Sequence, residues 1–313
     1  MVIKDSSMKN IQTKKTALTI IIVNWNNKKI LQDCLKSIYN TQINYNYEII
    51  VVDNNSEDGS VELIKNKFVD VILIENNKNI GFAKANNQAI KIAKTEHILL
   101  LNNDTIVTQN ICFSNMVRYM QKKPRVGVLG CKLLYPDGTL QSLGAKYPSA
   151  WEIFKNQILF SKTWNRFRKN KEKDHIFKRV DWISGACLLT RKEVFKKVGM
   201  LKEDYYMYGE DIEFCYRVHK AGWEIGVLTG ESIIHFLGKS TEKNSTETLY
   251  HLINNNLKNV KIIHNDEWQV LSAKVFYLIG VLMRAILAIF RKDKKIVDYL
   301  KLFKNIFNQW RIK

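Results

Sequence analysis

Residues 18–23 read LTIIIV, a run of β-branched and apolar side chains typical of a strand that is buried on both faces. Three further apolar runs follow it: EIIVVD at 48–53, VILI at 71–74 and HILLL at 97–101. Between these runs, residues 28–41, 59–68 and 82–94 have the apolar spacing of helices. Strands that alternate with helices predict βαβ units with right-handed crossovers, so we expect an α/β fold with a mostly parallel sheet.

The pattern changes after residue 125. Strands are predicted at 126–134, 139–143, 181–190 and 223–228, and helices at 210–221 and 246–263. The first two of these strands flank the turn Pro136-Asp137-Gly138, whose residues are typical turn formers. We therefore expect the second half of the sheet to differ from the regular βαβ pattern of the first half.

Polar residues follow each of the four strands of the first half. They are Asn24-Trp25-Asn26, then DNNSEDGS at 53–60, NNKNIGF at 76–82 and NND at 102–104. Ligands of open α/β sheets bind at the carboxyl ends of the strands, and four such clusters in succession exceed what turns and helix caps need. The sequence contains no GxGxxG and no GxxxxGK[ST], so a nucleotide would have to be held by side chains.

Several of these side chains suit a nucleotide site. Asp53 can accept hydrogen bonds from a base or a ribose, and Trp25 can lie against a base. Asp104 is a hard oxygen ligand suited to Mg²⁺ or Mn²⁺, which in turn binds diphosphate, although a helix N-cap is the alternative for this residue. His235 lies in an apolar run and, taken alone, is better explained as a core histidine than as a ligand.

Three carboxylates lie close together in the sequence MYGEDIE at 207–213. Acidic residues at the start of a helix interact favourably with its dipole, so capping alone explains them. A carboxylate beside glycine and aromatic residues can also act as a general base, which is the functional alternative.

The net charge of the 313-residue chain is +19, from 49 basic and 30 acidic residues. Such a charge fits a nucleic-acid binder, a membrane-surface protein or an enzyme that acts on anionic substrates. Two segments, 161–180 and 291–313, each hold eight Lys or Arg against two Asp or Glu and carry most of the excess. The sequence contains no recognisable nucleic-acid-binding module, so we expect no nucleic-acid partner.

The C-terminal part is apolar and basic. Residues 270–290 are mostly apolar but include Lys274 and Arg284, and the uninterrupted apolar stretch 275–283 is too short to span a bilayer as a helix. We interpret this segment and the basic helix predicted at 294–310 as an amphipathic region that lies at a membrane surface. A buried core helix is the alternative, and Arg284 argues against a transmembrane span.

The cysteines and the N-terminal residues indicate a reducing compartment. The five cysteines are odd in number, have no CxxC spacing and lie in apolar stretches, so we expect buried free thiols. Residues 1–16 are predicted to form a flexible basic leader, and no signal peptide is expected because the first apolar run is short.

Five motifs occur in one order along the chain: IIVNWN, VVDNNSEDGS, NKNIGFAKANN, LLLNND and the long block from ISGACLLT to HKAGW. Together they resemble the family 2 glycosyltransferases of the GT-A fold, and the VNWNN start and the block at 79–87 are most similar to the rhamnosyltransferase branch. The resemblance covers residues 17–240 and implies a GT-A domain, a Rossmann-like mixed sheet flanked by helices. It implies a donor nucleotide half at 17–104 and an acceptor half at 105–240, with 241–313 as a C-terminal helical, membrane-associating region.

The resemblance also implies roles for single residues. Asp53 would contact the nucleotide base with Val23 and Trp25 beside it, and the donor would lie near Asn79, Gly81, Asn87 and Asn103. Asp104 would be the metal ligand, in the place of the DxD motif whose first acidic position is Asn102 here, and His235 matches a histidine that completes the metal site in some relatives. Asp211 matches the catalytic base of inverting members, and Trp182, Gly185, Ala186 and Glu210 would lie on the acceptor side.

The implied function is that of an inverting, metal-dependent glycosyltransferase of cell-surface polysaccharide assembly, such as O-antigen synthesis. It would transfer L-rhamnose from dTDP-rhamnose to a hydroxyl of a glycan or lipid-linked acceptor, with Mg²⁺ or Mn²⁺ as cofactor. A UDP-hexose or UDP-HexNAc donor is the alternative, and a basic nucleic-acid-binding protein or a non-catalytic scaffold is the alternative of a different class. The expected location is cytoplasmic, peripheral on the inner face of the cell membrane, where anionic lipid would attract the basic segments.

Overall fold

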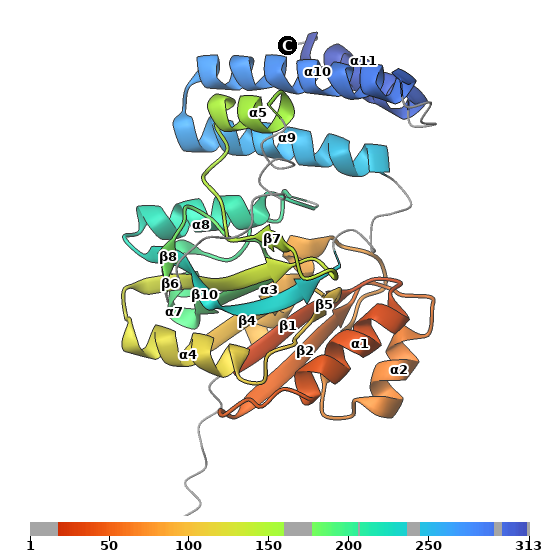
Figure 1. The fold of residues 1–313 in the computed structure, drawn as a ribbon. Coiled ribbons are helices and arrows are strands. Elements are labelled where there is room, and N and C mark those ends of the chain that lie inside the picture. The colour runs from red at the N-terminus through yellow and green to blue at the C-terminus, as the bar shows by residue number, and fades with distance from the viewer. Residues whose placement is uncertain (1–17, 160–176, 206, 237–244, 291–295, 312–313) are drawn as a thin grey trace, which may run out of the picture.

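The computed structural model describes residues 18–159, 177–205, 207–236, 245–290 and 296–311. Among them, ten strands form one mixed sheet with the order β3-β2-β1-β4-β9-β6-β10-β5, and β7 and β8 pair with β6 and β10 (Figure 1). The leader at 1–16 and most of the basic segment 161–180 lie outside the described residues. Strands of both predicted halves therefore belong to a single sheet.

The first half of the sheet is parallel, as predicted. β1 (Leu18–Asn24) pairs in parallel with β2 (Tyr47–Asp53) and β4 (His97–Leu101), and β2 pairs in parallel with β3 (Ile72–Glu75). The helices between these strands are α1 (Lys28–Tyr39), α2 (Ser60–Lys67) and α3 (Phe82–Ile92). Parallel pairing brings the polar residues that follow β1, β2 and β4 to one edge of the sheet.

The second half is mixed. β9 (Cys187–Arg191) runs antiparallel between β4 and β6 (Val126–Leu134), and β10 (Glu224–His235) is parallel to β6. The short strands β5 (Thr105–Ile106), β7 (Leu140–Ser142) and β8 (Lys178–Arg179) are antiparallel to their neighbours.

Two strand predictions in this half need correction. Residues 181–186 are not strand, because Asp181 and Trp182 bond to Ala145 and the chain then turns before β9 begins. β10 does not end near Leu228: an irregularity in the register between Leu228 and Ser232 lets the strand resume its pairing with β6 and continue to His235. The extension carries His235 to the same edge of the sheet as Asp104.

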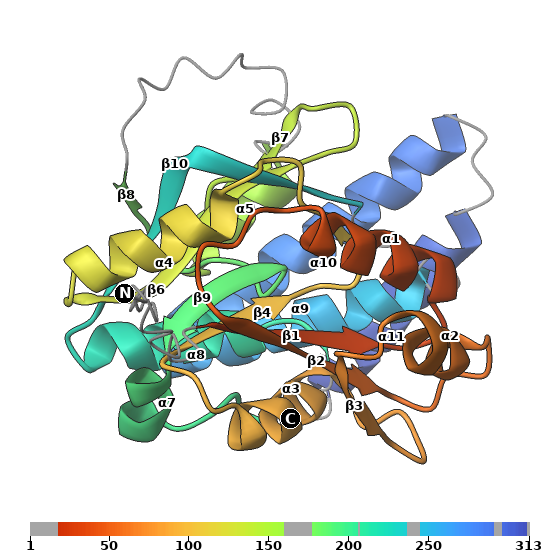
Figure 2. The same cartoon turned by 90° about the horizontal axis from the view of Figure 1, so that it is seen from below.

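Helices cover both faces of the sheet (Figure 2). Ile20 and Ile22 pack toward α1, α2 and α4 (Cys112–Lys122) on one face. Ile21 packs toward α3, α7 (Lys192–Val198) and α8 (Glu210–Lys220) on the other. This alternation confirms that the first strand is buried on both faces, and the five cysteines are buried and free as expected.

A separate layer of helices lies beyond α8: α5 (Ala150–Gln157), α9 (Ser245–His264), α10 (Glu267–Phe290) and α11 (Ile296–Arg311) (Figure 1). These helices have their own apolar core, which includes Leu257, Val260, Tyr277 and Ile306. Arg284 of α10 donates hydrogen bonds to Gln157 of α5 and to a backbone carbonyl of its own helix. Its guanidinium group therefore has polar partners within this layer of helices. The predicted C-terminal helical extension is therefore present.

One side of α10 is part of that core, and the other side is exposed. By length and composition α10 could cross a bilayer, and one third of its most apolar window, 33%, is buried among the described residues. The inner side of α10 is therefore a core helix, which was the alternative interpretation of the sequence, and its outer side is apolar and exposed.

Candidate active site

The ends of β1, β2 and β4 are joined by a buried hydrogen-bond network. The side chain of Asn24 donates to Asp53 at 2.9 Å and accepts from Asn103 at 2.8 Å. Asp53 also accepts the backbone N–H and the hydroxyl of Ser56, at 2.8 and 2.7 Å. Three strand ends are thereby held in one arrangement, with Trp25 43% exposed beside it.

A second network continues along the same edge to the block that follows β3. Asn79 accepts hydrogen bonds from the side chain of Asn54 and from the backbone N–H of Gly81. Asn54 in turn accepts from Asn76, which pairs reciprocally with Gln88 of α3. The donor-side residues Asp53, Asn79 and Gly81 thus lie on adjacent strand ends.

Asp104 and His235 come together from distant parts of the sequence. Oδ1 of Asp104 lies 3.2 Å from Nε2 of His235, and both side chains are buried. The pairing of β5 with β10 places His235 opposite Thr105, next to Asp104. The structure therefore brings together the two residues that the resemblance assigned to the metal.

Gln141 of β7 fixes the orientation of the His235 ring. Its amide nitrogen donates to the backbone carbonyl of His235 at 3.0 Å, so its amide oxygen is the atom that faces Nδ1 at 2.7 Å. Because that oxygen can only accept, Nδ1 is the ring nitrogen that donates to Gln141, and Nε2 is the ring nitrogen that lies toward Asp104.

These donors fit a divalent cation. A carboxylate oxygen and an imidazole nitrogen lie side by side, and the imidazole is oriented through its other nitrogen in the manner of metal-ligating histidines. No cluster of three or more His, Cys, Asp or Glu suited to a metal occurs in the described part of the chain. A cation held here would need further oxygen ligands from diphosphate or water.

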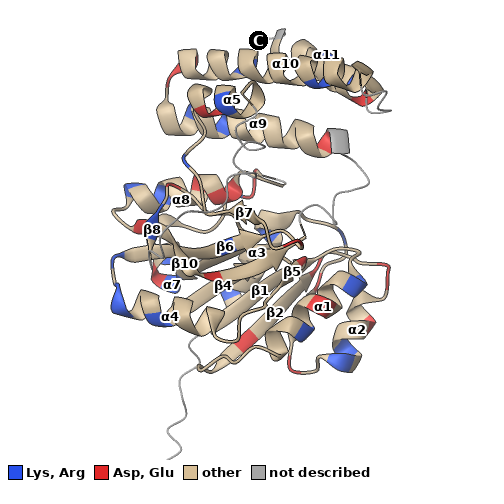
Figure 3. Cartoon of the chain, viewed as in Figure 1, with Lys and Arg blue, Asp and Glu red and all other residues tan. Residues whose placement is uncertain are grey.

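The acidic pair Glu210-Asp211 begins α8, directly after Gly209. The ribbon of α8 carries the red of Asp and Glu in Figure 3. Oδ2 of Asp211 accepts the backbone N–H of Gly185 at 3.1 Å, and Oδ1 accepts that of Ile212 at 2.8 Å. Glu210 is 5% exposed, and within the described residues its Oε2 has no hydrogen-bond partner.

The two carboxyl groups consequently differ in acidity. Burial, and then the neighbouring Asp211, raise the pKa of Glu210 to about 8. Burial also raises the pKa of Asp211, but the backbone N–H groups of Gly185 and Ile212 stabilise its charged form and oppose that shift. Of the two carboxyl groups, Asp211 is the one whose charged form is stabilised by backbone N–H groups, so it is the better candidate to act as the proton acceptor.

The turn at 184–186 links the acidic pair to the strand ends. Gly185 bonds Asp211, and the carbonyl of Ala186 accepts the backbone N–H of Asn102 at 3.1 Å. A Cβ atom on Gly185 would lie 3.4 Å from the ring of Phe82, directly after Gly81. The segments that hold Gly81, Asn102 and Asp211 thus meet at this turn.

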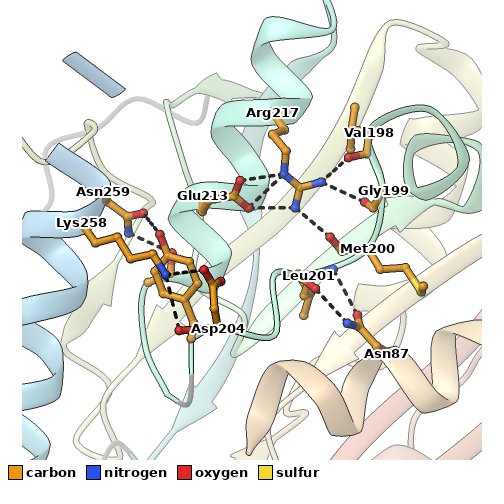
Figure 4. Close-up of polar contacts among 12 residues, drawn as sticks. Asn87, Val198, Gly199, Met200, Leu201, Asp204, Glu213, Arg217, Lys258 and Asn259 are labelled. Carbon is orange, nitrogen blue, oxygen red and sulfur yellow. Dashed lines mark hydrogen bonds and ion pairs between the residues drawn. The ribbon is translucent and has the colours of Figure 1, made fainter. Parts of the chain in front are cut away.

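Two predicted site residues are engaged in the scaffold. Asn87 is 2% exposed, and its side chain bonds both the backbone N–H and the carbonyl of Leu201 (Figure 4). The indole N–H of Trp182 donates to the carbonyl of Lys146. Their predicted roles toward donor and acceptor stay predictions, as do those of the other site residues.

Sequence reasoning missed Asn24 and Gln141 as site residues. Asn24 lies within the motif IIVNWN, but its two partners come from the end of β2 and from the segment that follows β4. Gln141 lies on a three-residue strand and is 94 residues from His235, so no local pattern indicated it.

The family model for glycosyl transferase family 2 matches residues 19–199. This chain belongs to glycosyl transferase family 2. The match includes the ends of β1, β2, β3 and β4 and the turn at 184–186, while Glu210, Asp211 and His235 lie beyond it.

Three of the curated relatives of this family 2 chain have names that refer to glycan assembly. It is 29% identical over 204 residues to the O-antigen biosynthesis protein RfbC of Myxococcus xanthus, covering 60% of this chain and 15% of that protein. It is 24% identical over 215 residues to an N-acetylglucosaminyl-diphospho-decaprenol L-rhamnosyltransferase of Mycobacterium tuberculosis, covering 64% of this chain and 70% of the relative. It is 27% identical over 245 residues to the low-salt glycan biosynthesis hexosyltransferase Agl10 of Haloferax volcanii, covering 74% and 71%.

Solved structures support the fold. The mannosyltransferase PcManGT of Pyrobaculum calidifontis, in complex with GDP-Man and Mn²⁺, superposes with a TM-score of 0.57 at 17% identity over 96% of this chain and 89% of its own. GalNAc-T7 with UDP, GalNAc and Mn²⁺ superposes with a TM-score of 0.55 at 18% identity over 70% of this chain and 43% of its own. Both are glycosyltransferases of the GT-A fold, so the predicted fold is confirmed.

Proposed function

We propose that this family 2 glycosyltransferase is an inverting enzyme in which Asp211 is the general base. The observation that carries the proposal is the placement of Asp211 by the N–H of Gly185, in the turn that also bonds Asn102. Through its bond to Asn102 this turn adjoins the end of β4, at the carboxyl edge of the sheet, where a nucleotide-sugar would bind.

The reaction follows from the charges at the site. An acceptor hydroxyl attacks C1 of the sugar, Asp211 takes the hydroxyl proton, and the bond from C1 to the diphosphate breaks on the opposite face. A single displacement of this kind inverts the anomeric centre. Glu210 stays protonated because ionisation of a second buried carboxylate beside Asp211 is unfavourable.

Asp104 and His235 would hold Mg²⁺ or Mn²⁺. When bound, the cation would stabilise the negative charge that grows on the departing nucleoside diphosphate. Asp53, with Asn24 and Ser56 fixing its orientation, would accept hydrogen bonds from the nucleotide base beside Trp25.

dTDP-rhamnose is the proposed donor. The M. tuberculosis relative, an L-rhamnosyltransferase, supports this choice of donor. The N-acetylglucosaminyl-diphospho-decaprenol in the name of that relative supports a lipid-linked acceptor in cell-surface polysaccharide assembly. A UDP-hexose or UDP-HexNAc is the second candidate, because GalNAc-T7 of the same fold was solved with UDP and GalNAc.

A donor panel tests the proposal. The chain is incubated with Mn²⁺, synthetic N-acetylglucosaminyl-diphospho-decaprenol and, in turn, dTDP-rhamnose, UDP-glucose and UDP-GlcNAc, and nucleoside diphosphate release is measured. We expect turnover with dTDP-rhamnose, loss of turnover with EDTA, and a product whose anomeric configuration, read by NMR, is opposite to that of the donor. Retention of configuration would contradict the role of Asp211, and turnover with a UDP-sugar alone would favour the second donor.

We also propose that the enzyme is peripheral on the cytoplasmic face of the cell membrane. In support, α10 and α11 form the outermost layer of the molecule (Figure 1), and α10 exposes an apolar stripe at helical spacing. The stripe consists of Trp268, Leu271, Val275, Ile279, Leu282, Ile286, Ile289 and Phe290. The segment 291–313, with its net charge of +6, would meet anionic lipid headgroups at about 1 kcal/mol per Lys or Arg near the surface.

Substitutions on the stripe test this location better than removal of 268–313, which would uncover the core that α10 shares with α5 and α9. We expect the triple change of Trp268, Leu282 and Ile289 to Ser to weaken binding to phosphatidylglycerol vesicles about tenfold or more, because each side chain would otherwise bury apolar area in the lipid. The control changes Val69, Ile92 and Ile111, exposed apolar residues outside this layer, to Ser. Equal vesicle binding by the two triple variants would refute the location.

A further inference from the structure

Helix α9 holds the backbone of the turn that precedes the acidic pair. The side-chain amide of Asn255 donates to the carbonyls of Met207 and Tyr208, both at 2.9 Å. One helical turn later, Asn259 donates to the carbonyl of Gly209 at 2.9 Å and accepts the hydroxyl of Tyr205 at 2.7 Å. Three consecutive carbonyls, 207–209, are therefore bonded by two asparagines of one helix.

The turn has a backbone conformation that needs such support. Tyr208 has φ 67°, in the left-handed region that a residue with a side chain rarely adopts, and Gly209 follows with φ 93°. A Cβ atom at Gly209 would lie 2.9 Å from Nδ2 of Asn259, so a larger residue here would displace the amide that bonds the turn. The bonds from α9 thus stabilise a conformation that the segment alone disfavours.

Further contacts from α9 support the same segment (Figure 4). Lys258 pairs with Asp204 at 2.7 Å, and its ammonium lies 4.0 Å from the ring centroid of Tyr205. Asn259 is fully buried, and its amide satisfies one donor and one acceptor of the turn. Asn255 is only partly buried, so its substitution perturbs the core less than that of Asn259.

We propose that Asn255 and Asn259 are positioning residues for Asp211, so that a helix outside the matched family region completes the active site. The inference rests on the proposed role of Asp211 as the base. Asp211 follows Gly209 by two residues, and its carboxylate must meet both the N–H of Gly185 and the acceptor hydroxyl. A turn released from α9 would move the base relative to Gly185, whose own turn is held to the end of β4 by the hydrogen bond between Ala186 and Asn102.

The chain offers a matched control on the same helix. Asn256 is partly buried, as is Asn255, but its amide donates to the hydroxyl of Tyr277 in α10, away from the turn. Asn255→Ala and Asn256→Ala each remove a partly buried asparagine amide from neighbouring positions. They differ in whether that amide reaches the turn before Asp211.

The experiment compares kcat, the affinity for dTDP and UDP with Mn²⁺, and Tm for the full chain and four variants: Asn255→Ala, Asn255→Asp, Asn256→Ala and Asp211→Asn. Turnover is measured as the release of nucleoside diphosphate from the donor in the presence of the acceptor N-acetylglucosaminyl-diphospho-decaprenol. Because a displacement of about 1 Å can cost about 10²-fold in rate, we expect Asn255→Ala to lower kcat by about 10- to 100-fold. The nucleotide affinity of Asn255→Ala should stay within about threefold of that of the unchanged chain. The control Asn256→Ala should keep kcat within about twofold of the unchanged chain.

Asn255→Asp separates positioning from packing. The carboxylate fills the same space but presents oxygens to the carbonyls of Met207 and Tyr208, so we expect it to lower kcat at least as much as Ala does. The inference is overturned if Asn255→Ala keeps kcat within about twofold of the unchanged chain. It is also overturned if Asn255→Ala and Asn256→Ala lose kcat, nucleotide affinity and Tm in parallel, which would assign both a general structural role.

The Asp211→Asn variant distinguishes this inference from the function on which it rests. Loss of turnover in Asp211→Asn together with full activity in Asn255→Ala would remove only the role of α9. Full turnover in Asp211→Asn would remove the base itself, whatever the asparagine variants do.

Discussion

Substitution of Asn87 distinguishes between two roles for this residue, one in the scaffold and one in binding the donor. Its side chain joins α3 to the backbone of Leu201 through two hydrogen bonds of 2.8 and 3.1 Å (Figure 4). It also reaches the carboxylate of Glu203. Asn87→Ala would leave the N–H and the carbonyl of buried Leu201 without these partners. The bond to Glu203 contributes little because Glu203 is exposed.

The expected cost follows from these contacts. Two buried hydrogen bonds at about 1 kcal/mol each, with a further penalty for backbone groups left without partners, give a loss of about 3 kcal/mol in the free energy of unfolding. That loss is about 10²-fold in the folding equilibrium and about 5–10 °C in Tm for a domain of this size.

Urea denaturation followed by tryptophan fluorescence measures the loss, and the donor KM is determined on the same samples. Asn86→Ala is the control, since Asn86 is equally buried but its side chain donates to the carbonyl of Phe82, one turn earlier in its own helix. We expect a cost of about 1 kcal/mol or less for the control. Unchanged stability of Asn87→Ala with a donor KM raised tenfold or more would refute the scaffold role and favour direct contact with the donor.

Two further predictions concern the acidic pair and the metal ligands. Because burial raises the pKa of Glu210 from 4.5 to about 8, the folded chain holds a proton that the unfolded chain releases, so the free energy of unfolding falls as pH rises between these values. Glu210→Gln should therefore gain in Tm over the unchanged chain as pH rises from 6 to 9, and an advantage independent of pH would contradict this. Gln141→Leu releases the ring of His235 and should weaken Mn²⁺ binding in the presence of UDP about tenfold, as measured by electron paramagnetic resonance. The control Gln157→Leu should leave Mn²⁺ binding unchanged. Equal effects of the two substitutions would contradict the role of Gln141 in orienting His235.

The parallel half of the sheet was predictable because its signal is local. In 18–23 every residue is apolar or β-branched, and consecutive residues pack on opposite faces, so one short run determines both the strand and its two-sided burial. The polar residues after the strands could likewise be placed at one edge, since parallel strands end together. The same reasoning places Asp53 and Asp104 at that edge from the sequence alone.

Long-range contacts determine what the sequence could not show. The segment 181–186 has strand-like composition, but its backbone bonds to Ala145, Asn102 and Asp211 and forms a turn instead. β10 continues past Gly230 because β6 and β5 are available as partners on either side. Gln141 and Asn255 act on residues 94 and 48 positions away, at distances where periodicity carries no information.

The role of Asp211 is the central claim, and its substitution by Asn tests it most directly. The variant keeps the size of the side chain and its ability to accept the N–H of Gly185 but removes the proton acceptor. Single-turnover transfer from the donor that the unchanged chain uses is measured together with dTDP or UDP affinity in the presence of Mn²⁺. We expect transfer to fall by at least about 10²-fold with nucleotide affinity retained, whereas transfer by Asp211→Asn at the rate of the unchanged chain would contradict the account.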